Sequence, residues 1–317
     1  MDLGTFFDAS RLVIVAGKGG VGKTTVTAAL ARAAALTGRS VLVVDVGGRA
    51  EQLAGLFGSD PFGYDDAVVQ PGGGRQGEVR ARTITPEYAL LEYLHDHGLK
   101  RLSNRLVRTG ALDVVATAAP GLDDILVLGK VKQLERAGAA DLILLDAPAA
   151  GHAITFLQSA AGLADAVKMG PIQAQAADVL ELLADPARCQ VLLVTLPEET
   201  PVNELVDTAF ALEDRVGVSL APIVVNACYP ERPDLDNGAL AGAALNGADK
   251  AALAAAAEFR RARHDLQAAQ TARLASLLPL PQVVLPFVFS AAIGPPEVDQ
   301  LAQSVADGIG ALPALGR

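Results

Sequence analysis

The chain has 317 residues, of which 51% are hydrophobic and 20% are charged. This composition is too apolar for a disordered chain, and the length allows one large domain or two average ones. The formal net charge of −10 disfavours non-specific binding to nucleic acid or to an anionic membrane.

The amino terminus lacks the basic start and apolar core of a signal peptide. Every apolar run is broken by a charge, Gln or Pro before it reaches the length of a membrane span. The only two cysteines, Cys189 and Cys228, form no metal-binding spacing and are predicted to be core thiols. We therefore expect a cytoplasmic protein without a direct membrane anchor.

Six short runs rich in β-branched residues alternate with Ala- and Leu-rich stretches. They are residues 12–15, 41–44, 142–145, 191–194, 223–225 and 283–285. Apolar runs of this kind, separated by helical patterns, predict a parallel sheet that is covered on both faces. Residues 78–84 are predicted as one more strand, and the Gly- and Pro-rich residues 61–77 as an irregular loop.

Helical patterns fill most of the remaining chain, at about 86–135, 151–184 and 249–278. The basic run at 260–263 lies inside the last of these and is predicted to be a solvated helix face. Because no internal repeat or linker divides the chain, we predict a single domain over residues 1–317 with helical embellishments at about 86–135 and 151–184.

A glycine-rich stretch follows the first predicted strand and precedes an Ala-rich helix. It reads Gly17-Lys18-Gly19-Gly20-Val21-Gly22-Lys23-Thr24-Thr25. The pattern is G-x-x-x-x-G-K-[ST], in which backbone N–H groups at a helix N-terminus converge on phosphate oxygens. Lys23 is expected to neutralise the β and γ phosphates of ATP, and the Thr24 hydroxyl to ligate Mg²⁺.

The same stretch also matches a dinucleotide-binding pattern. Gly17, Gly19 and Gly22 satisfy G-x-G-x-x-G, and Asp45 follows where a dinucleotide fold would hold a ribose. A dinucleotide site does not need the pair Lys23-Thr24, and Asp146, at the end of a predicted strand, is placed to organise a magnesium-bound water. These features favour a nucleoside triphosphate and predict a metal site at Thr24 and Asp146.

Lys18 makes the loop similar to the deviant Walker A motif, K-G-G-V-G-K-T-T, of an ATPase class that includes partitioning, septum-site and arsenical-pump ATPases. The resemblance implies an α/β, doubly wound, mostly parallel P-loop NTPase fold with a helical subdomain. It also implies a sandwich dimer in which Lys18 acts catalytically by reaching the nucleotide of the partner.

A second signature resembles the D-T-A-P-T-G-H switch of arsenical-pump and tail-anchored-protein-targeting ATPases. It runs from Asp146 to His152 and is followed by F-L-Q. The resemblance implies a nucleotide-sensing role for His152. Asn226 resembles the adenine-reading asparagine of the family, and Pro286 opens a segment that resembles its adenine loop.

Other stretches look most like divergent actinobacterial members, at 119–130 and 170–176. Such members tend to come as two unlike paralogues, so both a homodimer and a heterodimer are open. The C-x-x-C that binds zinc in tail-anchor-targeting members is absent, and the chain is poor in the methionines that line their client groove.

The sequence departs from the family where the second strand leads into switch I. Gly47 stands in place of the Asp that positions the attacking water, which puts hydrolysis in question. Asp45, two residues earlier, is the candidate catalytic carboxylate, against a structural or magnesium-shell role.

The sequence therefore predicts a dimeric Mg-ATP-dependent ATPase or nucleotide switch, whose closure is transmitted to the helical subdomain. The alternative is a weakly hydrolysing or inactive nucleotide-binding regulatory subunit in complex with an active paralogue. A partitioning ATPase that works on DNA or membrane is disfavoured by the acidic charge balance. The client stays open.

Overall fold

A computed structural model describes residues 1–109, 121–148, 150–166, 170–232 and 247–313. Its centre is a nine-stranded sheet with the order β3-β4-β2-β5-β1-β6-β8-β9, in which β7 also pairs with β6. The strands are β1 (Leu12–Ala16), β2 (Val41–Asp45), β3 (Ala67–Gln70), β4 (Val79–Thr83), β5 (Leu142–Asp146), β6 (Cys189–Thr195), β7 (Ser219–Leu220), β8 (Ile223–Cys228) and β9 (Gln282–Pro286). Only β3 runs antiparallel to its neighbour within this sheet. The predicted α/β fold with a mostly parallel sheet is confirmed.

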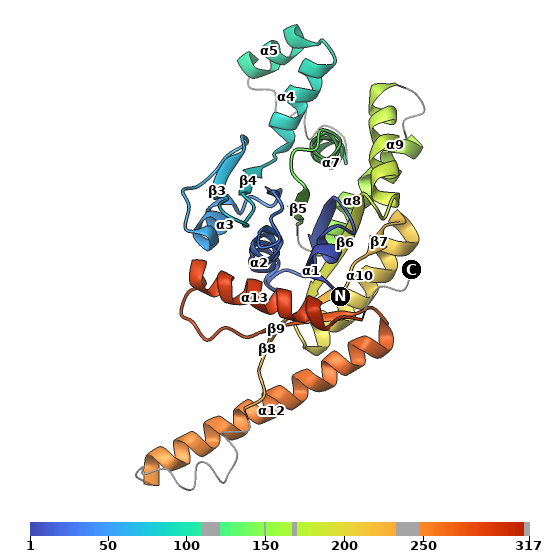
Figure 1. Cartoon of the computed structure of the whole chain (residues 1–317). Coiled ribbons are helices and arrows are strands. Elements are labelled where there is room, and N and C mark those ends of the chain that lie inside the picture. Colours follow the sequence, from blue (N-terminus) through green and yellow to red (C-terminus); the bar gives the residue numbers. More distant parts are fainter. Residues whose placement is uncertain (110–120, 149, 167–169, 233–246, 314–317) are drawn as a thin grey trace.

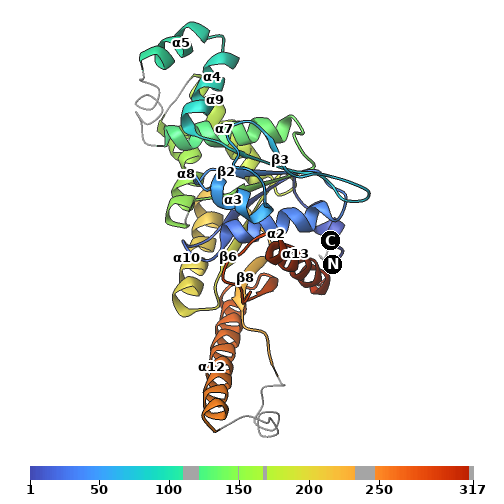
Figure 2. The same cartoon turned by 90° about the vertical axis from the view of Figure 1, so that its left-hand side faces the viewer.

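Helices cover both faces of the sheet (Figure 1, Figure 2). One face carries α1 (Leu3–Phe7), α2 (Lys23–Ala35), α3 (Ala50–Phe57) and α13 (Pro295–Ala311). The other carries α4 (Pro86–Asp96), α7 (Leu122–Arg136), α8 (Ala150–Ala166), α9 (Pro171–Ala184), α10 (Glu199–Val216) and the end of α12 (Gly247–Leu277), and α5 (Lys100–Thr109) extends beyond α4. Strand β1 serves both cores, since Leu12 and Ile14 face one and Val13 and Val15 the other.

All six predicted strands are confirmed, and the additional strand expected at 78–84 is β4. The irregular loop predicted at 61–77 is wrong in part, because residues 67–70 form the edge strand β3. Residues 151–184 form two helices, since Gly170 adopts a φ of 111° and Pro171 starts α9. Parts of the predicted helical segments, residues 110–120 and 167–169, lie outside the described residues.

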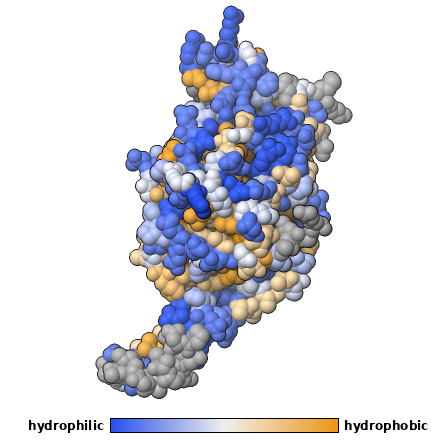
Figure 3. All heavy atoms as spheres, viewed as in Figure 1, coloured by the Kyte–Doolittle hydropathy of each residue, from blue (hydrophilic) through white to orange (hydrophobic). Residues whose placement is uncertain are grey.

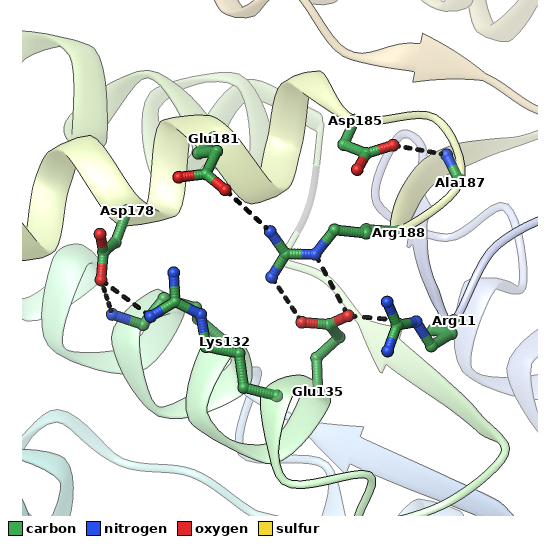
Figure 4. A network of polar contacts seen from close by, with 9 residues as sticks. Arg11, Lys132, Glu135, Asp178, Glu181, Asp185, Ala187 and Arg188 are labelled. Carbon is green, nitrogen blue, oxygen red and sulfur yellow. Dashed lines mark hydrogen bonds and ion pairs between the residues drawn. The ribbon is translucent and has the colours of Figure 1, made fainter.

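Glu135 fixes the helical layer to the sheet at the amino ends of the strands (Figure 4). This α7 carboxylate is 1% exposed and accepts hydrogen bonds of 3.3 and 2.6 Å from the guanidinium of Arg188, just before β6. Arg11, which precedes β1, lies 3.3 Å from the same carboxylate. The exposed Glu181 of α9 is 3.5 Å from Arg188. Three elements therefore share one buried anion.

Helix α12 is the outlier of the fold. It has 31 residues and projects away from the sheet in both views (Figure 1, Figure 2). Of its residues only Ala257, Gln267 and Leu274 are buried.

Figure 3 shows mainly hydrophilic residues over the upper part of the molecule, where α4 and α5 lie, and more hydrophobic residues across the lower body. No helix of the described residues is long and apolar enough to cross a membrane.

Candidate functional site

The phosphate loop occupies the turn from β1 into α2, at the carboxyl edge of the sheet. Its conformation requires glycine at two points. Gly17 has a φ of 155°, and a Cβ there would lie 2.2 Å from the carbonyl oxygen of Val194. Gly22 has a φ of 89°, and a Cβ there would lie 2.4 Å from Nδ2 of Asn226. These glycines let the loop bend tightly before the N-terminus of α2, where unpaired N–H groups point outward.

The remaining loop residues divide between the surface and the interior. Gly19 and Gly20 are exposed at the tip, Val21 is buried, and Thr25 is half-buried in the first turn of α2. Lys23 is buried, and its ammonium donates to the carbonyl oxygen of Lys18 over 3.1 Å. The lysine thus folds back over its own loop, with its charge inside the curve of the backbone.

Burial lowers the pKa of Lys23, and the positive charge of Arg49 lowers it further, while the carboxylate of Asp146 opposes both effects. An anion placed between these groups would relieve both the desolvation and the repulsion. The electrostatics of the loop therefore favour an anionic ligand.

Asp146 ends β5 beside the start of α2 and is completely buried. Its Oδ2 accepts a 2.7 Å hydrogen bond from the Thr24 hydroxyl, and its Oδ1 lies 3.4 Å from the Thr27 hydroxyl. Burial raises the pKa of Asp146, and the bond from Thr24 and the charge of Arg49 pull it back. A hydroxyl and a carboxylate are the hard oxygen donors that Mg²⁺ prefers, so Thr24 and Asp146 fit that ion.

Asp45 lies directly opposite Asp146 in the pairing of β2 with β5 and is also completely buried. Its Oδ1 accepts the backbone N–H of Gly47 at 2.9 Å, and its Oδ2 accepts the backbone N–H of Arg49 at 2.8 Å. The Thr83 hydroxyl adds a contact of 3.4 Å. In this conformation the Asp45 carboxylate holds the turn that follows β2, and a catalytic role for it stays a prediction.

Lys18 points away from the loop toward α10. Its Nζ donates to Oε1 of Glu204 over 2.6 Å, and both side chains are partly exposed. The lysine expected to act across a dimer interface therefore has a partner within its own chain.

His152 lies in the first turn of α8 and is exposed. Its charge acts on Asp124 of α7, whose pKa is raised to about 6 by burial and by the neighbouring Asp123, an effect that His152 opposes. Ala149, within the second signature, lies outside the described residues. The first turn of α8 is thus electrostatically linked to the start of α7.

Asn226 and Pro286 come together at the ends of β8 and β9. Asn226 donates through Nδ2 to the carbonyl oxygen of Val21 over 2.9 Å, which ties β8 to the phosphate loop. Pro286 pairs with Cys228 across the two strands. Beside them lies a cluster of aromatic rings and one guanidinium, formed by Tyr229, Phe287, Phe289 and Arg260.

The end of β8 contains an unusual backbone turn. Ala227 has a φ of 57°, the only positive value of a non-glycine residue among those the structure describes. Gln267 of α12 holds this turn, since its Nε2 donates to the Ala227 carbonyl at 3.2 Å and its Oε1 accepts the Tyr229 N–H at 2.7 Å. The projecting helix is therefore bonded directly to the strand end that carries Asn226.

A comparison with known protein families matches residues 10–174 to the anion-transporting ATPases. This match spans more than half of the chain and includes the phosphate loop, Asp45, Asp146 and His152. The chain belongs to the anion-transporting ATPase family.

Individual members of this ATPase family show the same likeness. ATPase BagA of Mycobacterium tuberculosis is 36% identical over 227 residues, which are 69% of this chain and 66% of that protein. A putative arsenical pump-driving ATPase of Halobacterium salinarum is 28% identical over 73% of this chain and 39% of its own length. ATPase get3 of Schizosaccharomyces japonicus is 29% identical over 46% of this chain and 43% of its own. The match thus covers just under two thirds of BagA and smaller parts of the other two.

The fold of this chain brings most of the predicted site residues to one edge of the sheet. Thr24 of the phosphate loop bonds to Asp146, and Asn226 bonds to the same loop through Val21. Three residues that the sequence reasoning missed join them, namely Glu204, Gln267 and Arg49. Arg49 alone carried a signal, because it lies two residues after the unusual Gly47.

Proposed function

We propose that this chain binds ATP together with Mg²⁺ at the phosphate loop and works as an ATPase or nucleotide switch. The observation that carries the proposal is the convergence of Lys23, Thr24 and the buried Asp146 at the N-terminus of α2. Membership of the anion-transporting ATPase family supports it.

The residues of the loop divide the work of binding. Lys23 and the N–H groups at the start of α2 would hold the phosphate oxygens, because both present positive charge to the same concave space. Thr24 and Asp146 would hold Mg²⁺, which neutralises phosphate charge when it is bound. The aromatic cluster beside Asn226 and Pro286 would receive the base, since flat rings and a guanidinium stack on it.

The path from the phosphates to the helical layer is short. β5 ends at Asp146 and α8 begins at Ala150, so movement of the carboxylate would reach α8 across only three intervening residues. Helix α8 packs on α7, α9 and α10 in a shared core. We therefore propose that nucleotide binding shifts α8 and, through it, the helices predicted as embellishments of a single domain.

We further propose a dimer in which Lys18 reaches the nucleotide of the partner, as either two copies of this chain or this chain with a paralogue. In this proposal, the intrachain bond to Glu204 belongs to the arrangement before the two subunits close on the nucleotide. Lys18 and Glu204 are both partly exposed, so the bond can open without unpacking the core.

A second candidate function is a regulatory subunit that hydrolyses ATP slowly or not at all. The observation in its favour is the state of switch I, where Gly47 carries no side chain and both Asp45 oxygens are bonded to backbone N–H groups. A water would find no free carboxylate there unless the turn opened.

Equilibrium binding of ATP and steady-state hydrolysis with Mg²⁺ test both proposals on the purified chain. The Lys23→Ala variant should lose the phosphate contacts, whereas Lys100→Ala, an exposed lysine of α5, serves as the matched control. Turnover that is lost only in Lys23→Ala supports an ATPase. Binding without turnover supports the regulatory subunit, and absence of binding in the unsubstituted chain overturns both.

A further inference from the structure

Arg49 enters the site from the loop after β2 and lies at the two groups assigned to Mg²⁺. Its Nη1 donates to the Thr24 hydroxyl oxygen over 3.2 Å and lies 3.7 Å from Oδ2 of Asp146. The Asp146 side chain is 0% exposed, and that of Arg49 is 29% exposed. We propose that Arg49 is a built-in counter-ion that holds the magnesium position, and that Mg²⁺ must displace it. The inference rests on the nucleotide-binding function proposed above.

The hydrogen bonds of Thr24 explain why the two cations exclude each other. The hydroxyl donates its proton to Asp146 and accepts from Arg49, so both of its functions are engaged within the protein. A metal would take an oxygen lone pair of the same hydroxyl. A guanidinium and a divalent cation within a few ångströms of one carboxylate repel each other strongly in a buried site.

The backbone around Arg49 is fixed, but its side chain has room to leave. Its N–H is bonded to Asp45, and α3 begins at the next residue. Alongside runs a cavity lined in part by Arg49 itself, Phe62, Tyr64 and Tyr88. Rotation about the side-chain bonds would move the guanidinium into this cavity without unfolding the turn.

A counter-ion at Arg49 would change how nucleotide binding depends on Mg²⁺. Without Mg²⁺, Arg49 continues to supply a positive charge beside Lys23, so the nucleotide phosphates still meet two cations. With Mg²⁺, the displacement of the guanidinium offsets part of the binding free energy that the metal contributes. We therefore expect nucleotide binding by the unsubstituted chain to depend only weakly on Mg²⁺.

The test is the binding of a fluorescent ATP analogue across a Mg²⁺ titration, including a chelator endpoint. In Arg49→Gln, the Mg²⁺ concentration at half-saturation should fall by about tenfold, since the competing charge is gone. The loss of nucleotide affinity when Mg²⁺ is chelated should be correspondingly larger in Arg49→Gln than in the unsubstituted chain. Arg101→Gln, which removes an exposed charge of the same sign on α5, should behave like the unsubstituted chain.

A second variant and a second readout distinguish the loss of the Arg49 charge from misfolding of the variant. Arg49→Lys keeps a cation on a chain with a different reach and should lie between Arg49→Gln and the unsubstituted chain. Because the protein has no tryptophan, Tyr88→Trp places a single reporter in the cavity that would receive Arg49. Its emission should respond to Mg²⁺ with nucleotide when Arg49 is present and lose most of this response in Arg49→Gln.

Two outcomes distinguish failure of the Arg49 counter-ion from failure of the nucleotide site. If the unsubstituted chain binds the analogue but Arg49→Gln leaves the half-saturating Mg²⁺ concentration unchanged, the counter-ion is refuted and the nucleotide site stands. If Lys23→Ala and the unsubstituted chain both fail to bind, the nucleotide site and the counter-ion fall together.

Discussion

The ammonium of Lys18 and the carboxylate of Glu204 form a 2.6 Å ion pair between the phosphate loop and α10 of the same chain. Any role of Lys18 toward a second subunit therefore begins with the loss of this bond. In the proposed dimer, this pair would compete with closure rather than support it.

Glu204→Gln should accordingly strengthen nucleotide-dependent self-association. A partly exposed ion pair is worth about 0.2–1 kcal/mol, so the dissociation constant should fall by no more than about fivefold. Analytical ultracentrifugation with and without Mg-ATP measures it, and Glu213→Gln, an exposed carboxylate on α10, is the control. Weaker association in Glu204→Gln would mean that Glu204 itself belongs to the interface.

The consequence of Gly47 can be tested by restoring a carboxylate. A Cβ at this position would meet nothing closer than 3.6 Å, where it faces the guanidinium of Arg49. In Gly47→Asp the new carboxylate should pair with Arg49, so the single variant gains little. Combined with Arg49→Gln, it should raise ATP turnover by about a hundredfold over Arg49→Gln alone, the low end for a positioned general base.

Gly47→Asn in the same Arg49→Gln background is the matched control, because it has the same size and no basic oxygen. Equal turnover of the Asp and Asn variants would show that a carboxylate at position 47 is not the missing group.

Asp124 should make stability depend on pH. Burial raises its pKa to about 6 in the folded chain, against about 3.9 when unfolded. The folded state then holds the proton more tightly, so this carboxyl lowers the unfolding free energy as pH rises from about 4 to about 6. Denaturant unfolding should show that Asp124→Asn gains stability relative to the unsubstituted chain over this range. Asp214→Asn, an exposed carboxyl of α10, should show no such trend.

Among the polar residues of the helical layer, Glu135 should be the one whose substitution lowers the free energy of unfolding most. Glu135→Gln leaves Arg188 without its buried counter-charge and should lower the unfolding free energy by about 3 kcal/mol. Glu181→Gln removes the other, 69% exposed carboxylate near Arg188 and should cost less than about 1 kcal/mol. Equal losses in the two variants would contradict the assignment of Glu135 as the anchor.

The sequence was sufficient to predict the features of the fold and the site that depend on local residue patterns. The strands and the phosphate loop were predictable because apolar runs and glycine spacing are written in consecutive residues. Strand β3 was missed because its four residues lie within a Gly- and Pro-rich stretch and pair only at the sheet edge.

Contacts between residues far apart in the sequence could not be predicted from local sequence patterns. The basic run at 260–263 was predicted to be a solvated face, yet Arg260 stacks on Phe289 and Arg263 pairs with Glu198. Gln267 bonds to the carbonyl oxygen of Ala227, 40 residues away, and no periodicity in the sequence predicts such a partner. The pairing of Arg49 with Thr24 likewise exists only once β1, β2 and β5 lie side by side.

The bond between Gln267 and the end of β8 gives α12 a mechanical meaning. From Gln267 to the first residue of α12 the helix extends roughly 30 Å at 1.5 Å per residue. The half nearer Gln267 contacts the body through Arg263 and Arg260, whereas the residues before the buried Ala257 are mostly exposed. A tilt of about 5° about Gln267 would move the tip by about 2.6 Å over this length. Because Gln267 is bonded beside Asn226, and Asn226 is bonded to the phosphate loop, a displacement of the loop and a tilt of α12 would be coupled through the end of β8.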